Sequence, residues 1–182
     1  MRIAIEGNIG SGKTTQLDLL SRIFPVYTEP VHLWPLEEFY ANPKEQAFHM
    51  QTAVLTSFID NGPGIYERSP RSSREVFSNF EGRPSEAMTY DLLYHRLGWE
   101  PDYWIFLDSN PELCYKRVTG RMGAGDSYVT PDYLKLIDQR YREFQTKVSE
   151  RSFVVNADRP ISEIYDTILK ILSGLKFENY IL

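Results

Sequence analysis

The sequence is short of cysteine, of long apolar runs and of surplus positive charge, and each shortage excludes a class of protein. Cys114 is the one cysteine, so the chain cannot form an internal disulfide, and a reducing cytoplasm is the expected location. No apolar run approaches the roughly 18 residues that a membrane span needs. The opening residues 1–5, MRIAI, favour a strand over a secretory leader. We therefore expect no membrane partner.

The charge balance argues against a nucleic-acid polymer as partner. The net charge is -5, whereas proteins that bind a phosphate backbone usually carry a basic face. A small phosphorylated ligand needs only a local cluster of positive groups. The hydrophobic share of 42% lies in the globular range, and 182 residues predict one compact domain over 1–182.

Short β-rich runs alternate with segments of helix-forming length, which predicts an α/β fold with a parallel sheet. The expected strands are 2–6, 25–28, 64–67, 103–107 and 152–156. Pro111 and Pro131 follow Asn110 and Thr130, so each pair is expected to cap and begin a helix. Apolar residues at three- and four-residue spacing over 161–172 predict a last helix packed on the core.

The strongest motif lies between the first strand and its helix and matches the phosphate-loop pattern. Its residues are Gly7, Asn8, Ile9, Gly10, Ser11, Gly12, Lys13 and Thr14, and Thr15 follows directly. Glycines allow a tight turn with inward-facing N–H groups, and the helix N-terminus adds partial positive charge. We expect Lys13 to neutralise the β- and γ-phosphates of ATP and Thr14 to bind Mg²⁺. The alternative is a glycine-rich turn with no ligand.

A phosphate loop alone names no reaction, because motors, GTPases, ATPases and small-molecule kinases share it. The Asn-Lys-x-Asp segment with which GTPases read guanine is missing from the sequence. Asp108 comes at the end of an apolar strand, as the carboxylate of motors and ATPases does. However, 182 residues leave little room for a motor or for an ATPase coupled to other work. The sequence favours a kinase.

Two carboxylates follow predicted strands, where open parallel sheets bind their ligands. Glu29 follows the second strand, and Glu67 ends the third, just before Arg68. Phosphoryl transfer to an alcohol needs one carboxylate to accept the hydroxyl proton and usually another on the Mg²⁺ side, while an arginine can hold the donor or the nucleophile. The alternative is a structural Glu67–Arg68 ion pair beside a solvated Glu29.

Two further patterns point to a bound nucleotide and a bound base. Arg117 and Arg121 share a helix face before the glycine-bearing segment 122–127, so they could close over phosphates, or could form a plain solvated face. On the helix predicted over 43–60, Gln51 interrupts an apolar face with Phe48, Leu55 and Phe58. Its amide could pair with the edge of thymine or, after a flip, of cytosine; the alternative is a partly exposed glutamine.

In order and spacing, these motifs resemble the deoxynucleoside kinase family, which includes the cellular and herpesviral thymidine kinases. The resemblance implies a three-layer P-loop kinase fold with a five-stranded parallel sheet flanked by helices, usually in a homodimer. It also implies ATP with Mg²⁺ as phosphate donor, in deoxynucleotide salvage. The residues that carry it are the loop 7–14, Glu29-Pro30-Val31, Trp34, Tyr40, Gln51-Thr52, Glu67-Arg68-Ser69, Arg117 and Arg121.

The resemblance also assigns roles. Glu29 resembles the family's general base, which accepts the proton of the 5′-hydroxyl, with Arg68 as its partner. Glu67 resembles a carboxylate on the Mg²⁺ side, although either glutamate could take the proton. The other roles are these: Tyr40 and Asp126 for the 3′-hydroxyl, Trp34 and Phe77 around the base, Gln51 on its edge, and Arg117 and Arg121 in a lid over ATP.

Three departures from the family bear on the substrate. Phe58 and Ser73 stand where members that prefer deoxycytidine or purines carry Arg and Asp, and Met50 stands where Phe usually precedes the glutamine. A small serine leaves room for a 5-methyl group, so thymidine is the expected substrate. Two alternative functions remain. One is a thymidylate kinase, whose phosphate loop has a similar sequence, and the other is a nucleotide-binding regulator without catalysis.

Overall fold

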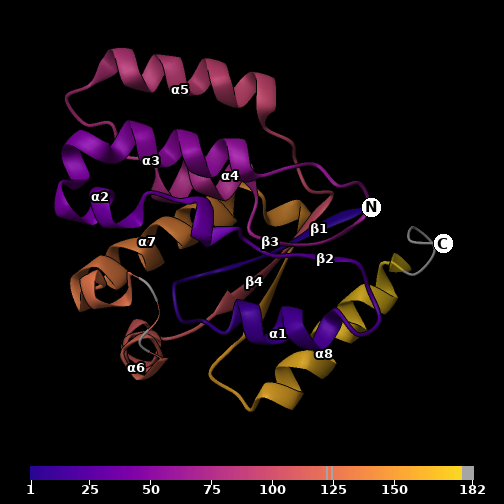
Figure 1. Cartoon of the computed structure of the whole chain (residues 1–182). Coiled ribbons are helices and arrows are strands. Elements are labelled where there is room, and N and C mark those ends of the chain that lie inside the picture. Colours follow the sequence, from indigo (N-terminus) through magenta and orange to yellow (C-terminus); the bar gives the residue numbers. More distant parts are fainter. Residues whose placement is uncertain (122, 124, 178–182) are drawn as a thin grey trace.

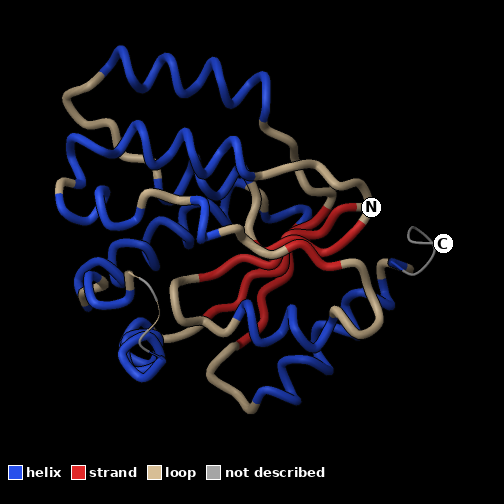
Figure 2. The backbone as a smooth tube through the Cα atoms, in the orientation of Figure 1, coloured by secondary structure: helices blue, strands red, loops and turns tan. Residues whose placement is uncertain are grey.

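The computed structural model describes residues 1–121, 123 and 125–177, and its centre is a five-stranded sheet in which all neighbouring strands are parallel. The strand order is β2-β3-β1-β4-β5. Figure 2 shows the strands gathered in the middle of the molecule, with helices around them. The strands are β1 (Arg2–Gly7), β2 (Val26–Tyr27), β3 (Gly64–Glu67), β4 (Tyr103–Asp108) and β5 (Ser152–Asn156). The α/β fold class is therefore confirmed, with the edge strand β2 shorter than predicted.

Helices cover both faces of the sheet, as parallel sheets require (Figure 1). Alternate side chains along β1 and β4 point to opposite faces, so Ile3 and Ile105 join one core while Ala4 and Trp104 join another. The first core packs against α8 (Ile161–Gly174) and α1 (Lys13–Leu20), and the second against α7 (Pro131–Lys147). This three-layer arrangement places the loop after β1 at one open end of the sheet.

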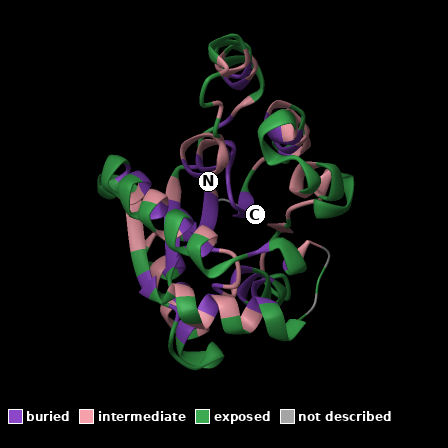
Figure 3. Ribbon diagram, turned by 90° about the vertical axis from the view of Figure 1, so that its left-hand side faces the viewer, coloured by how far each residue is buried: buried purple, intermediate pink, exposed green. Residues whose placement is uncertain are grey.

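The remaining helices build a second wall beside the carboxyl ends of the strands. Helix α3 (Pro43–Ser57) packs between α2 (Leu36–Ala41) and α5 (Pro84–Leu97), with α5 outermost (Figure 1). After β3, the short helix α4 (Pro70–Ser72) continues into a π-helical turn, Ser73–Phe77. Exposed residues lie along the outer sides of these helices (Figure 3). Helix α6 (Pro111–Arg121) and 3₁₀ turns at Val31–Leu33, Asp126–Tyr128 and Ser149–Arg151 complete the described elements.

Helix boundaries follow the local chemistry of the sequence. Asn110 Oδ1 accepts a bond of 2.7 Å from the Glu112 amide, and Thr130 Oγ1 accepts one of 3.2 Å from the Tyr133 amide, which confirms both caps. Helix α3 was predicted to reach residue 60 but ends at Ser57. The chain must turn there to enter β3 through the Asn-Gly-Pro-Gly segment 61–64. In the described ranges, no helix combines the length and apolarity that crossing a membrane requires.

Candidate active site

The phosphate loop turns sharply between β1 and α1. Gly10 and Gly12 have φ of 82° and 95°, the left-handed region that glycine adopts without strain. A Cβ on Gly10 would lie 2.6 Å from the carbonyl oxygen of Cys114, so a side chain would not fit there. Helix α1 begins without a side-chain cap, which leaves amides of its first turn for a ligand.

Lys13 is folded over this loop and almost fully buried. Its Nζ donates to the carbonyl oxygens of Gly7 at 3.1 Å and Asn8 at 2.9 Å. Burial, together with the positive charge of Arg68, lowers the pKa of Lys13 to about 8. In the described part of the chain, no carboxylate forms an ion pair with Lys13, so a bound phosphate would supply the missing negative charge.

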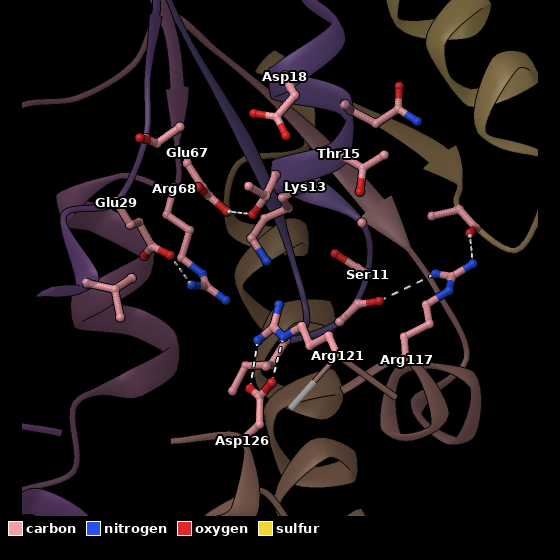
Figure 4. Close-up of a pocket in the computed structure, with 18 of the residues that line it drawn as sticks. Ser11, Lys13, Thr15, Asp18, Glu29, Glu67, Arg68, Arg117, Arg121 and Asp126 are labelled. Carbon is pink, nitrogen blue, oxygen red and sulfur yellow. Dashed lines mark hydrogen bonds and ion pairs between the residues drawn. The ribbon is translucent and has the colours of Figure 1, made fainter. Parts of the chain in front are cut away.

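A cavity of about 760 Å³ opens over the loop at the carboxyl ends of the central strands. Open parallel sheets bind their ligands at this edge. In Figure 4, Glu29, Glu67 and Arg68 lie on one side of Lys13 and Arg117 on the other. The cavity thus collects the charged residues that the sequence singled out, which are spread over more than 100 positions, from Lys13 to Asp126.

Glu29 and Arg68 form a shielded ion pair in the wall of this cavity. Arg68 Nη1 donates to Glu29 Oε2 at 2.6 Å, and their side chains are 10% and 7% exposed. The alternative of a Glu67–Arg68 pair beside a solvated Glu29 is therefore wrong. Burial raises the pKa of the Glu29 carboxyl, and the charge of Arg68 partly offsets this effect. A carboxylate whose pKa is raised is a stronger base, which suits it to accept a proton.

Arg68 is held by contacts that the sequence did not reveal. Its backbone has a φ of 62°, which is rare outside glycine, and its Nε donates to the Tyr141 hydroxyl at 3.0 Å. Tyr141 and Ser69 in turn donate to the two carboxylate oxygens of Glu6, at 3.3 and 2.8 Å. Burial raises the pKa of Glu6 to about 7. The sequence signal for these contacts was Glu6, an acidic residue inside an otherwise apolar strand, because a buried carboxylate needs hydrogen-bond partners.

Thr14 and Glu67 meet at the end of α1 and β3 nearest the loop. Thr14 Oγ1 donates to Glu67 Oε1 at 2.9 Å. In the described ranges no group of three or more histidine, cysteine or acidic side chains could hold a metal. Mg²⁺ usually takes one or two protein oxygens and completes its shell with phosphates and water, so this pair fits the ion.

The two arginines of α6 diverge instead of sharing one target. Arg117 donates to the carbonyl oxygen of Ala157 at 3.0 Å and, more weakly, to that of Gly10 at 3.4 Å. Arg121 makes a bidentate contact with Asp126, at 2.7 and 2.8 Å (Figure 4). Both side chains line the large cavity, and the sequence did not predict their hydrogen-bond partners.

Asp126 and Tyr40, which were expected to act together, line the same cavity but have different contacts. Asp126 is occupied by Arg121 and by the Gly123 amide at 2.7 Å. The Tyr40 ring stacks on Tyr128, with centroids 4.9 Å apart. Within the described residues there is no hydrogen bond between Tyr40 and Asp126, although both line the cavity. The expected lid positions 122 and 124 lie outside the described residues.

A second, smaller cavity of about 100 Å³ adjoins the first and is mostly aromatic and aliphatic. Gln51 lines it and is 5% exposed, so the alternative of a partly exposed glutamine is wrong. Of its predicted face, only Phe58 joins Gln51 at the cavity, because Phe48 and Leu55 turn toward α5. The lining residues that the sequence singled out are Ile9, Glu29, Trp34, Tyr40, Met50, Gln51, Phe58, Arg68, Ser73 and Phe77; Leu36, Phe39, Val54 and Tyr133 were missed.

Side-chain contacts fix the walls of this small cavity. Trp34 Nε1 donates to Ser57 Oγ at 2.9 Å, which holds the indole against α3. The Arg68 guanidinium carbon lies 4.7 Å from the centre of the Phe77 ring, within the range of a cation–π contact. Ser73 Oγ donates to Gln51 Oε1 at 3.1 Å. A flat ring could therefore lie between aromatic walls and meet one polar edge.

Two relatives and one solved structure are similar to this chain. Putative kinase protein 029R of Invertebrate iridescent virus 3 is 32% identical over 95% of this chain and 96% of its own. The thymidine kinase of Ictalurid herpesvirus 1 is 30% identical over 92% of this chain and 84% of its own. The solved structure of deoxyadenosine kinase from M. mycoides with bound dCTP covers 96% of this chain and 100% of its own, with 22% identity and a TM-score of 0.82.

The family model for deoxynucleoside kinase matches residues 3–172, nearly the whole chain. The matched region contains the phosphate loop, the Glu29–Arg68 pair and both cavities. The chain belongs to the deoxynucleoside kinase family.

Proposed function

We propose that this kinase transfers the γ-phosphoryl group of ATP to the 5′-hydroxyl of a pyrimidine deoxynucleoside, with thymidine preferred, for deoxynucleotide salvage. One observation carries the proposal: Glu29 and Arg68 line both the large polar cavity and the small aromatic one. A nucleoside whose base fills the small cavity would present its sugar to this pair. The triphosphate would approach the same point from the phosphate loop.

The charged residues then have distinct tasks. Glu29 accepts the proton of the 5′-hydroxyl. At the same time the hydroxyl oxygen forms a bond to the γ-phosphorus, and the bond from that phosphorus to the bridging oxygen of ADP breaks. Arg68 orients Glu29 through their 2.6 Å contact, and Lys13 binds the phosphates. Thr14 and Glu67 would hold Mg²⁺, which neutralises charge on the β- and γ-phosphates when bound.

The preference for thymidine follows from the polar edge and the size of the small cavity. Gln51 offers an amide oxygen and nitrogen, the pair that a pyrimidine edge requires. Ser73 and Phe58 provide neither the carboxylate nor the guanidinium that would favour an exocyclic amine. The thymidine kinase of Ictalurid herpesvirus 1 supports this choice by similarity.

The proposal extends to the rest of the site and to the chain. Trp34 and Phe77 would enclose the base, and Tyr40 and Asp126 would hold the 3′-hydroxyl once Arg121 leaves Asp126 for the phosphates. Arg117 would stay near the loop. We further propose that residues 1–182 form one domain, that the protein works as a homodimer, and that its single cysteine suits a cytoplasmic location.

A substrate panel with labelled ATP and Mg²⁺ tests the proposal. We expect phosphate transfer to thymidine, weaker transfer to deoxycytidine, and little to the purine deoxynucleosides or to thymidine monophosphate. Transfer to thymidine monophosphate but not to thymidine would identify a thymidylate kinase instead. ATP binding without transfer to any of these acceptors would favour a nucleotide-binding regulator.

A further inference from the structure

A tyrosine on α7 lies between the arginine of the active site and a buried carboxylate. Arg68 Nε donates to the Tyr141 hydroxyl at 3.0 Å, and that hydroxyl donates to Glu6 Oε2 at 3.3 Å. Another nitrogen of the same guanidinium, Nη1, donates to Glu29 at 2.6 Å. Tyr141 and Glu6 are buried, and neither lines the large or the small cavity. We therefore expect neither to touch a substrate.

The donors and acceptors present fix the direction of both hydrogen bonds. A guanidinium has no acceptor, so the Tyr141 oxygen must accept from Arg68. The phenolic proton then needs an acceptor of its own, and among the described residues Glu6 Oε2 is the one within hydrogen-bonding distance. Burial raises the pKa of Tyr141, so the phenol keeps this proton. The hydroxyl is thus bonded on both sides, to Arg68 and to Glu6.

Two carboxylates compete for the charge of Arg68. This charge partly offsets the rise in pKa that burial causes in Glu6 and in Glu29. Glu29 contacts Arg68 directly, whereas the Tyr141 hydroxyl stands between Arg68 and Glu6. Opposite charges attract more strongly at shorter distance and in a buried site, so a guanidinium that is free to move would be drawn toward either carboxylate. The hydroxyl satisfies one oxygen of Glu6 without letting the guanidinium reach it.

We infer that Tyr141 is a positioning residue for phosphoryl transfer: its hydroxyl keeps Arg68 apart from Glu6 and holds the guanidinium against Glu29. The inference rests on the proposed function and adds a residue that touches neither substrate. An edge contact with Phe77, with ring centroids 6.1 Å apart, helps to fix the Tyr141 ring. The ring in turn places the hydroxyl. Because Tyr141 and Glu29 bind different nitrogens of one planar group, together they fix its position and its plane.

The test is Tyr141→Phe, assayed with ATP, Mg²⁺ and thymidine at about pH 7.5, above the pKa of about 7 that burial gives Glu6. The ring stays in the core, but Arg68 Nε loses its acceptor and can approach Glu6. We expect kcat to fall about tenfold, the scale of a hydrogen bond to a charged group, while KM for thymidine and for ATP changes less than about twofold. A crystal structure of the variant should show Arg68 in contact with Glu6; an unmoved Arg68–Glu29 pair would contradict the inference.

A second change, Glu6→Gln, removes the competing charge. By itself it should lower kcat only about twofold, because the amide oxygen can still accept from Tyr141. Added to Tyr141→Phe, it should raise kcat again to within about threefold of the unaltered protein, since no carboxylate at position 6 competes with Glu29. A purely structural role for Tyr141 predicts a further loss instead. A double variant no faster than Tyr141→Phe overturns the inference. So does a Glu6→Gln variant as slow as Glu29→Gln, a result that does not depend on Tyr141→Phe being folded.

Tyr66→Phe is the matched control. The Tyr66 hydroxyl also accepts one hydrogen bond, from the Asn61 amide at 3.0 Å, and donates one, to the Gly62 carbonyl at 2.7 Å, and Tyr66 lines neither cavity. It should lower the melting temperature but leave kcat unchanged. An equal fall of kcat in this control would reduce Tyr141 to a packing role and overturn the inference. If the unaltered protein phosphorylates thymidine and Tyr141→Phe has the same kcat, the inference fails while the proposed function stands. If the unaltered protein phosphorylates no nucleoside, both fall.

Discussion

The large and the small cavity share a wall but differ in size, polarity and origin. The large one, about 760 Å³, is lined by Lys13, Arg117 and acidic side chains, whereas the small one, about 100 Å³, is mostly aromatic and aliphatic. Eight consecutive residues, 9–16, line the first. The second is lined by single residues and adjacent pairs scattered between positions 9 and 133. Phosphate binding is thus encoded locally, and base selection depends on how distant elements pack.

This difference predicts a division of labour. Changes in the large cavity should alter the rate for every nucleoside alike, because all of them use the same triphosphate and the same proton acceptor, Glu29. Changes around the small cavity should alter the choice between nucleosides more than the rate. Three experiments test this division, in order of decreasing expected effect.

Glu29→Gln should have the largest effect. It removes the proton acceptor while the amide oxygen can still accept from Arg68, so kcat should fall roughly 10²–10⁴-fold for thymidine and deoxycytidine equally. Nucleoside binding, followed by calorimetry, should change little. Glu38→Gln, an exposed position on α2, is the control and should have normal turnover. Unchanged kcat in Glu29→Gln would transfer the role of base to Glu67.

The pH dependence of ATP binding should show an effect of intermediate size. The pKa of Lys13 is lowered to about 8, so the ammonium that binds phosphate is present below that pH and is lost above it. The dissociation constant for ATP should therefore rise about tenfold between pH 7.5 and 9. In Lys13→Arg the guanidinium stays charged, and the profile should flatten even though affinity is lower. An equally steep profile in that variant would assign the titration to another group.

The smallest expected effect is a change of substrate ratio in the double variant Phe58→Arg with Ser73→Asp. The carboxylate would accept from the exocyclic amine of cytosine, and the guanidinium would balance its buried charge. We expect kcat/KM to shift about fivefold toward deoxycytidine, with the affinity for ATP unchanged. Ser73→Asp alone is the control, since it buries an unpaired charge and should lower the melting temperature. Persistent preference for thymidine in the double variant would contradict the account of the base cavity.

The sequence by itself determined the sheet, its helical layers and the phosphate loop. Strands 64–67 and 152–156 were placed to the residue, because short β-branched and aromatic runs bounded by turn residues leave few alternatives. The glycines and Lys13 of the loop act through backbone geometry within one turn, which spacing reveals. Glu29 and Arg68 could be named as candidates because both follow strands whose ends meet at one edge.

Only the tertiary structure decided which candidates pair with which. It joined Arg68 to Glu29 and Tyr141, and Tyr90 to Ser73, across separations that no local pattern encodes. The direction of a buried hydrogen bond depends on every donor and acceptor around it, and these come from elements far apart in the chain. Spacing along a sequence reports which face a side chain occupies, and packing decides what it meets there.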